Sequence, residues 1–292
     1  MSGVQTRTVK PDEAGMRLDR WFKANFPQVR HGELEKFLRK GQVRVAGGRV
    51  KASRRLEAGE EIRIPPLSDA PKPAPRRHDP ADAEAIRRMT VFEDDSIIAL
   101  NKPFGLAVQG GAGMKQHIDG MLRALEKDDE RPRLVHRLDK DTGGLLLIAK
   151  TRQAAQRLAD AFKGHAVDKT YWALAAGSPR PREGTINMPI AKKMTRVGDG
   201  EEERVVPVDG EDAKRAITDY QIIEDAGTVS FLAMRPVTGR THQLRVHAAA
   251  IGCPIVGDGK YGGEKAHIEG VSPKLHLFCR SIPFRIPRRA GA

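Results

Sequence analysis

The sequence has few cysteines, no long apolar run and no excess of acidic residues. Its 292 residues include two cysteines, Cys253 and Cys279, which favours a reduced cytosolic protein over a disulfide framework. No run approaches the roughly 20 apolar residues that a membrane-spanning helix needs. The first seven residues also lack the hydrophobic core of a signal peptide. We therefore expect a cytoplasmic protein that does not enter a membrane.

Two common ligand-binding motifs are missing as well. The glycine-rich residues 110–113 are not followed by the Lys-Ser/Thr pair of a phosphate-binding loop. Neither cysteine lies at zinc-ligand spacing from His117, His165 or His267. We therefore predict no such nucleotide site and no zinc site.

Positive charge is in excess and is concentrated towards the N-terminus. The net charge is +13, and residues 1–78 contain 18 basic and 9 acidic side chains. A block this basic would neutralise phosphates and gain affinity from counterion release. The alternative is a solvated surface that keeps the protein soluble. Charge alone leaves both interpretations open.

A compact basic module is predicted near the N-terminus. Apolar residues recur at helical spacing over residues 17–26 and 32–40. A hairpin is expected around Gly47-Gly48, and a last short strand includes Ile62 and Ile64. Two helices and a few short strands are expected from this stretch.

The module resembles the S4 RNA-binding domain. The resemblance rests on Gly15-Met16-Arg17-Leu18-Asp19-Arg20-Trp21, the basic second helix and Gly41-Gln42-Val43-Arg44-Val45. In that domain the second helix and the hairpin lie along structured RNA. The implied contact residues are Arg30, Lys36, Arg39, Lys40, Arg44 and Lys51. A small basic domain that binds a protein is the alternative to this S4-like domain, which we place at residues 1–67.

A proline-rich linker is predicted over residues 68–88, followed by a larger domain over residues 89–292. Residues 65–80 include six prolines, and such a stretch is expected to be extended. Residues 193–215 are polar and indicate an insertion or a long surface loop. Further strands and helices are predicted at 96–100, 145–149, 152–163, 171–174, 217–222, 229–234, 242–250 and 275–278. Because they do not alternate strictly, we assign the domain to the α+β class.

The most informative stretch is residues 136–144, His-Arg-Leu-Asp-Lys-Asp-Thr-Gly-Gly, which precedes an apolar run. Asp139 lies there between cations on a glycine-ended turn. Such an aspartate can simply cap its own turn, or it can be a reactive carboxylate that the neighbouring cations keep ionised. With Asp141 it also forms the Asp-x-Asp pair of a metal-dependent nuclease, although magnesium sites usually gather carboxylates without adjacent cations.

A second polar stretch, residues 236–247, is expected to open a helix. Arg240 and His242 lie near its N-terminus, where anions are favoured. Arg245 follows among apolar residues and, if buried, needs a carboxylate partner. We predict that this partner is Asp139; a solvent-facing arginine is the alternative.

The larger domain resembles the RluA-type pseudouridine synthases. Residues 107–113 and 118–125 resemble the RluC-like branch in particular, and the basic module resembles that of members with an N-terminal S4 domain. Four segments together carry the resemblance to the family. The segments are Asn101-Lys102-Pro103-x-Gly105, residues 136–144, Lys169-x-Tyr171 and residues 238–247. They occur in the family's order and span most of residues 90–262. Lys140 stands where the family usually has arginine, which keeps the charge.

The resemblance implies a fold and a reaction. The fold is an α+β catalytic domain with a large mixed, mostly antiparallel sheet flanked by helices and loops, preceded by a small α/β S4-like domain. The reaction is the conversion of specific uridines to pseudouridine in large-subunit (23S) ribosomal RNA, by a monomer without cofactor or metal. The alternatives are a pseudouridine synthase that acts on tRNA and a non-catalytic RNA-binding ribosome assembly factor.

The resemblance also assigns residues. Asp139 would be the catalytic aspartate, and Arg245 would pair with it and hold it ionised and aimed. Tyr171 would lie against the flipped uracil and take part in proton handling, although a lone strand tyrosine is more often a core residue than a catalytic one. The implied RNA contacts in this domain are His136, Arg137, Arg240 and His242.

Overall fold

The computed structural model describes residues 3–29, 31–67, 79–110, 114, 116–127, 130–163, 167–197, 200–210 and 213–283. The chain divides into two units, Met1–Arg77 and His78–Ala292. Arg30 and residues 68–78 of the predicted linker lie outside the described residues. Within the described ranges, no helix is both long and apolar enough to cross a membrane.

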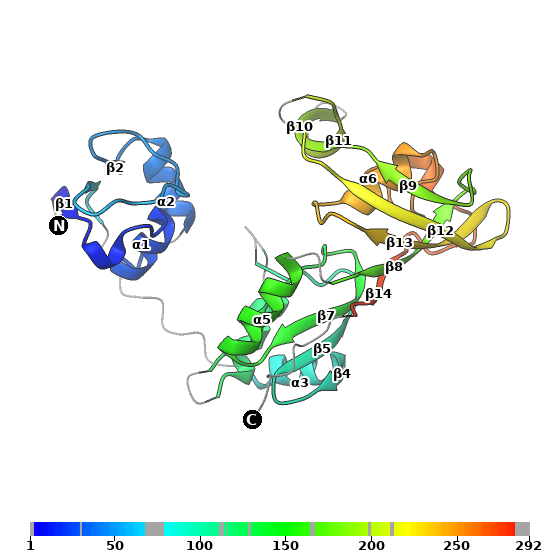
Figure 1. Ribbon diagram of the computed structural model, residues 1–292, viewed down its shortest axis with the longest axis horizontal. Helices are drawn as coiled ribbons and strands as arrows, with labels where there is room; N and C mark the ends of the chain where they lie inside the picture. Colours follow the sequence, from blue (N-terminus) through cyan, green and yellow to red (C-terminus); the bar gives the residue numbers. More distant parts are fainter. Residues whose placement is uncertain are drawn as a thin grey trace, which may run out of the picture. The chain divides into compact units, whose positions relative to one another are not determined.

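The first unit is a small α/β module (Figure 1). Three strands form an antiparallel sheet in the order β1-β3-β2. On the first helix Leu18, Trp21 and Phe22 are buried, and the rings of Trp21 and Phe22 lie 5.5 Å apart, edge to face. Both predicted helices and the last predicted strand are confirmed. The elements are β1 (Gln5–Thr8), η1 (Pro11–Glu13), α1 (Leu18–Asn25), α2 (His31–Arg39), β2 (Arg44–Val45) and β3 (Glu61–Ile64).

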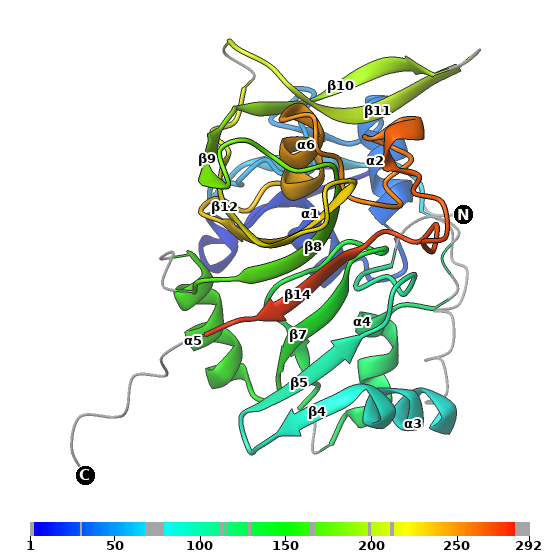
Figure 2. The same ribbon diagram turned by 90° about the vertical axis from the view of Figure 1, so that its right-hand side faces the viewer.

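The second unit is built on a nine-stranded sheet (Figure 2). The strand order is β4-β5-β7-β14-β8-β13-β12-β9, and β6 pairs with β7. The pairing of β14 with β7 is parallel, and the other pairings are antiparallel. The predicted α+β class and the mixed, mostly antiparallel sheet are confirmed. The strands are β4 (Thr90–Glu93), β5 (Ile97–Lys102), β6 (Arg133–Leu134), β7 (Gly143–Ala149), β8 (Thr170–Ala176), β9 (Glu183–Asn187), β12 (Ile217–Asp225), β13 (Val229–Pro236) and β14 (Leu277–Ser281).

Short helices cover the sheet. The main core packs Ile86, Ile118 and Leu244 of three helices against strand residues such as Leu146 and Leu232. A smaller cluster packs the helix predicted at 152–163 against β5 and β7. The helices are α3 (Pro80–Met89), α4 (Ile118–Met121), α5 (Arg152–Lys163) and α6 (Gln243–Ala250), with 3-10 turns η2 (Leu122–Leu125) and η3 (Gly263–Ala266).

Residues 193–215 were predicted to be an insertion or a long surface loop, and the loop alternative is wrong for residues 193–197 and 200–207. β10 (Ile190–Val197) and β11 (Gly200–Pro207) form an antiparallel ribbon of their own (Figure 2). At its base Ile190 and Val205 are buried with Val246 of α6. Most of its remaining side chains are polar or charged, so the ribbon lacks the apolar alternation that marks a half-buried strand.

The predicted linker also ends earlier than residue 88, because Pro80–Met89 forms α3. The side chain of Asp79 accepts a hydrogen bond from the backbone N–H of Ala81 at 2.9 Å and so caps this helix. Pro80 takes the first helical position, where a missing N–H is tolerated. The second unit therefore includes residues that composition alone assigned to the linker.

Candidate active site

Asp139 lies in the turn between β6 and β7, and a buried lysine holds this turn. The Lys102 side chain, 1% exposed, donates from Nζ to the carbonyls of Pro103, Leu106 and Lys140 at 2.8 to 2.9 Å. Burial lowers the pKa of Lys102 to about 8. The end of β5 is thus tied to the residue that follows Asp139. The sequence motif contains Lys102, but we assigned it no role.

A close approach of two backbones fixes the other end of the turn. Gly144 has a φ of +104°, and a Cβ there would lie 2.3 Å from the carbonyl oxygen of Cys279. Only glycine fits this position, because both the backbone angle and the space exclude a side chain. The turn that carries Asp139 is therefore closed against β14.

Two adjoining cavities, of about 480 and 860 Å³, share the wall that contains Asp139. The first cavity is also lined by Tyr171 from β8, and both are lined by Arg245 from α6. The three predicted catalytic residues therefore meet around the first cavity, although they lie on separate elements. The residues common to both cavities are Arg137, Leu138, Asp139, His242 and Arg245.

The predicted pairing of Arg245 with Asp139 is wrong. Arg245 donates from Nε and Nη2 to the two carboxylate oxygens of Asp258, at 2.8 and 2.7 Å. Asp258 is 1% exposed and also accepts a hydrogen bond from the backbone N–H of Tyr261. Burial opposes the charge on Arg245, yet the bonds to Asp258 raise its pKa. A buried arginine does need a carboxylate here, but the chain after α6 supplies it with better, two-pronged geometry.

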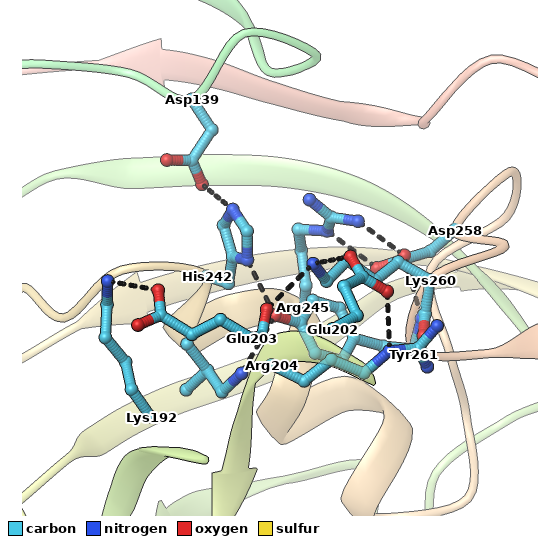
Figure 3. A network of polar contacts seen from close by, with 11 residues as sticks. Asp139, Lys192, Glu202, Glu203, Arg204, His242, Arg245, Asp258, Lys260 and Tyr261 are labelled. Carbon is cyan, nitrogen blue, oxygen red and sulfur yellow. Dashed lines mark hydrogen bonds and ion pairs between the residues drawn. The ribbon is translucent and has the colours of Figure 1, made fainter. Parts of the chain in front are cut away.

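The neighbour of Asp139 is His242, with its Nε2 3.8 Å from the Asp139 Oδ2. On its other side, Nδ1 of His242 lies 2.6 Å from the hydroxyl of Tyr261. Figure 3 shows the imidazole between these two groups, beside the Arg245–Asp258 pair. We did not identify Tyr261 or Asp258 from the sequence. The signal in the sequence was that the glycine-rich residues 257–263 contain a carboxylate and one of the chain's three tyrosines.

Tyr171 is buried, with 8% of its surface exposed. Burial, then the proximity of Cys279 and Asp139, raises its pKa well above the ordinary value. The phenol therefore keeps its proton at neutral pH and can donate a hydrogen bond. Its position in the first cavity is compatible with the predicted contact to a base.

Two predicted RNA contacts lie at the cavities with their charge exposed. Arg137 lines both cavities. Arg240 lines the first, and its Nε donates to the carbonyl of Arg215 at 3.1 Å. Both guanidinium groups are placed where a phosphate could approach.

His136, another predicted RNA contact, lines the first cavity but is held there as a neutral group. Its Nε2 accepts a hydrogen bond from the backbone N–H of Leu147 at 2.9 Å, and its ring lies 4.8 Å from that of Phe162. Burial, then the Lys169 ammonium, lowers the pKa of His136 to about 3. A neutral imidazole that supports β7 offers no charge to RNA.

The unfolding free energy should therefore depend on the ionisation of His136. The unfolded histidine binds a proton below about pH 6.5, whereas the folded one stays neutral down to about pH 3. The stabilisation from keeping His136 neutral is therefore fully present above about pH 6.5, the pKa of the unfolded histidine. It is lost as the pH falls from there towards about 3, the pKa of the folded one. Between pH 7 and pH 5, wild type should lose about 2 kcal/mol more than His136→Gln, whose amide oxygen still accepts from Leu147.

Urea unfolding at the two pH values measures this difference. His267→Gln, which replaces an exposed histidine, is the matched control and should behave as wild type. Equal pH dependence in wild type and His136→Gln would contradict the assignment.

In the first unit, the described S4 candidates are all exposed. Arg44 also donates to the carbonyls of Gly41 and Gly47, which holds its guanidinium at the turn after α2. The unit therefore presents a basic surface. The residues in question are Lys36, Arg39, Lys40, Arg44 and Lys51.

The fold and the site together define an enzyme with two adjoining cavities, both lined by Asp139, Arg137 and Arg245. In the described part of the chain, no three His, Cys, Asp or Glu side chains are grouped to hold a metal ion. The family profile described as RNA pseudouridylate synthase matches residues 96–250. The chain belongs to this family.

Individual relatives agree with this membership. The chain is 40% identical over 256 residues to the ribosomal large subunit pseudouridine synthase C of Rickettsia felis, covering 85% of this chain and 82% of the relative. It is 38% identical over 291 residues to the protein of that name from Haemophilus influenzae, covering 98% and 89%. The solved human RNA pseudouridylate synthase domain containing 4 is 28% identical with a TM-score of 0.55, covering 69% of this chain and 86% of that one.

Proposed function

We propose that this chain converts uridines to pseudouridine in large-subunit ribosomal RNA, with Asp139 as the reacting carboxylate and without a cofactor. One observation carries the proposal: Asp139 lies in the wall common to two cavities, near Tyr171 and Arg245. The two bacterial relatives, 40% and 38% identical, are named for the large ribosomal subunit, and this supports the substrate class.

The reaction breaks the N-glycosidic bond, turns the base and rejoins it through carbon. Asp139 would either attack the ribose or take a proton from C2′, and both routes need an ionised carboxylate. The target base must leave its stack to reach such a group. The first cavity would receive it against Tyr171, while Arg137 and Arg240 contact the flanking phosphates.

The first unit would hold the RNA as an S4-like domain. Its exposed basic residues on and after α2 supply the positive charge for this contact. The protein would act in the cytoplasm as a monomer.

Neutralising Lys36, Arg39 and Lys40 together should weaken RNA binding and make it less dependent on salt.

Mapping pseudouridines in cells that lack this protein tests the proposal. Specific uridines of large-subunit RNA should stay unmodified, and wild-type protein should restore them. Loss of modification in tRNA instead would favour the tRNA alternative. Unchanged RNA modification would favour an assembly factor. Purified protein should remain active in EDTA and leave the RNA chain intact, unlike a metal-dependent nuclease.

A further inference from the structure

We infer that His242 and Tyr261 form a positioning pair that presents a fixed N–H to the carboxylate of Asp139. This inference rests on the proposed function, because it takes Asp139 as the reacting group. The two residues come from different segments, the start of α6 and the glycine-rich residues 257–263. Their contacts determine where the imidazole proton lies.

The hydroxyl of Tyr261 determines the tautomer of His242. It accepts a hydrogen bond from the backbone N–H of Val205 at 3.4 Å, so its own proton is free to point at Nδ1 of His242, 2.6 Å away. Burial raises the pKa of Tyr261 and lowers that of His242, so the phenol stays protonated and the imidazole stays neutral. Nδ1 is then the acceptor, and the ring proton must be on Nε2, facing Asp139.

The backbone of His242 is held in an unusual conformation to allow this. Its φ is +56°, in the left-handed region that residues other than glycine seldom adopt. Such a conformation persists only where surrounding contacts enforce it, and it is concentrated at functional sites. It places the imidazole in the wall of both cavities while α6 begins at the next residue.

Contacts with α6 and with the ribbon β10–β11 hold Tyr261 in place. The guanidinium of Arg245 lies over its ring, 4.9 Å from the centroid. The ammonium of the adjacent Lys260 forms an ion pair with Glu202 of β11. The backbone carbonyl of Lys260 accepts a hydrogen bond from the guanidinium of Arg204, also on β11, at 2.7 Å. The ribbon β10–β11 therefore anchors the tyrosine that orients His242 (Figure 3).

The pair acts on one oxygen of Asp139. At 3.8 Å, the Nε2–Oδ2 distance exceeds that of a hydrogen bond, and contacts of this kind often shorten when substrate binds. If Nε2 of His242 donates to Oδ2 of Asp139, the other carboxylate oxygen, Oδ1, is free to react.

The charged groups facing His242 are Asp139 from the turn after β6, Arg245 from α6, and Asp258 and Lys260 from the following loop. A proton added to His242 at low pH would place a cation beside Asp139 and weaken it as a nucleophile or base.

Steady-state kinetics on the RNA substrate test the pair with three variants. His242→Ala should lower kcat about 100-fold, and Tyr261→Phe about 10-fold, with KM within about twofold of wild type. His242→Gln should retain more activity than His242→Ala, because its amide can still donate to Oδ2. Tyr261→Phe should also shift the acid limb of the pH profile upward, because it removes the bond that favours the neutral imidazole.

Tyr220→Phe is the matched control. Tyr220 is also buried, and its hydroxyl donates to the carbonyl of Pro181 at 3.0 Å, but it lines neither cavity. Its kcat and pH profile should match wild type.

An unchanged kcat and acid limb in Tyr261→Phe would overturn the inference, and so would equal losses in His242→Gln and His242→Ala. Should Tyr261→Phe fail to fold, the two His242 variants decide. Absence of pseudouridine formation by wild-type protein on any RNA would instead refute the proposed function itself.

Discussion

Asp139→Asn is expected to abolish pseudouridine formation and to leave RNA affinity nearly unchanged. The amide has the size of the carboxylate but can neither attack the ribose nor take a proton from it. Losing the essential reacting group should lower the rate by about 10⁴-fold or more. Because one negative charge disappears near Arg137 and His242, RNA should bind as well as before or slightly more tightly.

Chemical mapping of pseudouridine and filter binding of the RNA measure the two properties separately. Asp160→Asn is a suitable control, because Asp160 is an exposed carboxylate on α5 that accepts hydrogen bonds from the side chain of Gln156. Persistent modification by Asp139→Asn would disprove the mechanism. A parallel loss of affinity would show that Asp139 mainly holds RNA.

Asp258→Ala is expected to destabilise the protein by about 3–5 kcal/mol, because it leaves the buried Arg245 guanidinium without its counter-charge. The side chains of Arg245 and Asp258 are 10% and 0% exposed, and their closest N···O distance is 2.7 Å. The Lys192–Glu203 pair has the same 2.7 Å distance, but its side chains are 59% and 57% exposed. Glu203→Ala should therefore cost under about 1 kcal/mol, and the two variants isolate the effect of burial.

Urea unfolding measures both changes. The double variant Arg245→Met/Asp258→Leu should regain much of the stability, because apolar side chains can replace a buried ion pair. It should not regain activity, because the guanidinium in the cavity wall is gone. Similar costs for Asp258→Ala and Glu203→Ala would contradict this account.

The local features of the site could be predicted from the sequence. The glycine-ended turn around Asp139 and the helix over residues 152–163 follow from residues adjacent in the chain. The partner of Arg245 could not be predicted in this way. Helical phase shows that a buried arginine needs a carboxylate, but Asp139 and Asp258 both satisfy that need until the path of the loop after α6 is known.

The ribbon β10–β11 and the helix α3 were missed for a different reason. The ribbon β10–β11 packs its apolar residues at one end and exposes charged ones elsewhere, so neither strand shows alternation. For α3, the prolines before it dominated the composition, although Asp79-Pro80 is a good start for a helix. For α3, average composition was a poorer guide than the chemistry of single positions.

The place of β14 in the sheet bears on how the enzyme is made. The strand lies between β7 and β8 and pairs with both, through Phe278 and Cys279 in each case. It thus joins the part of the sheet that carries Asp139 to the part that carries Tyr171. During translation, both parts are synthesised before β14, the strand that joins them. The nascent chain therefore cannot join the two parts through β14, and so cannot fix Asp139 beside Tyr171, until Ser281 has left the ribosome.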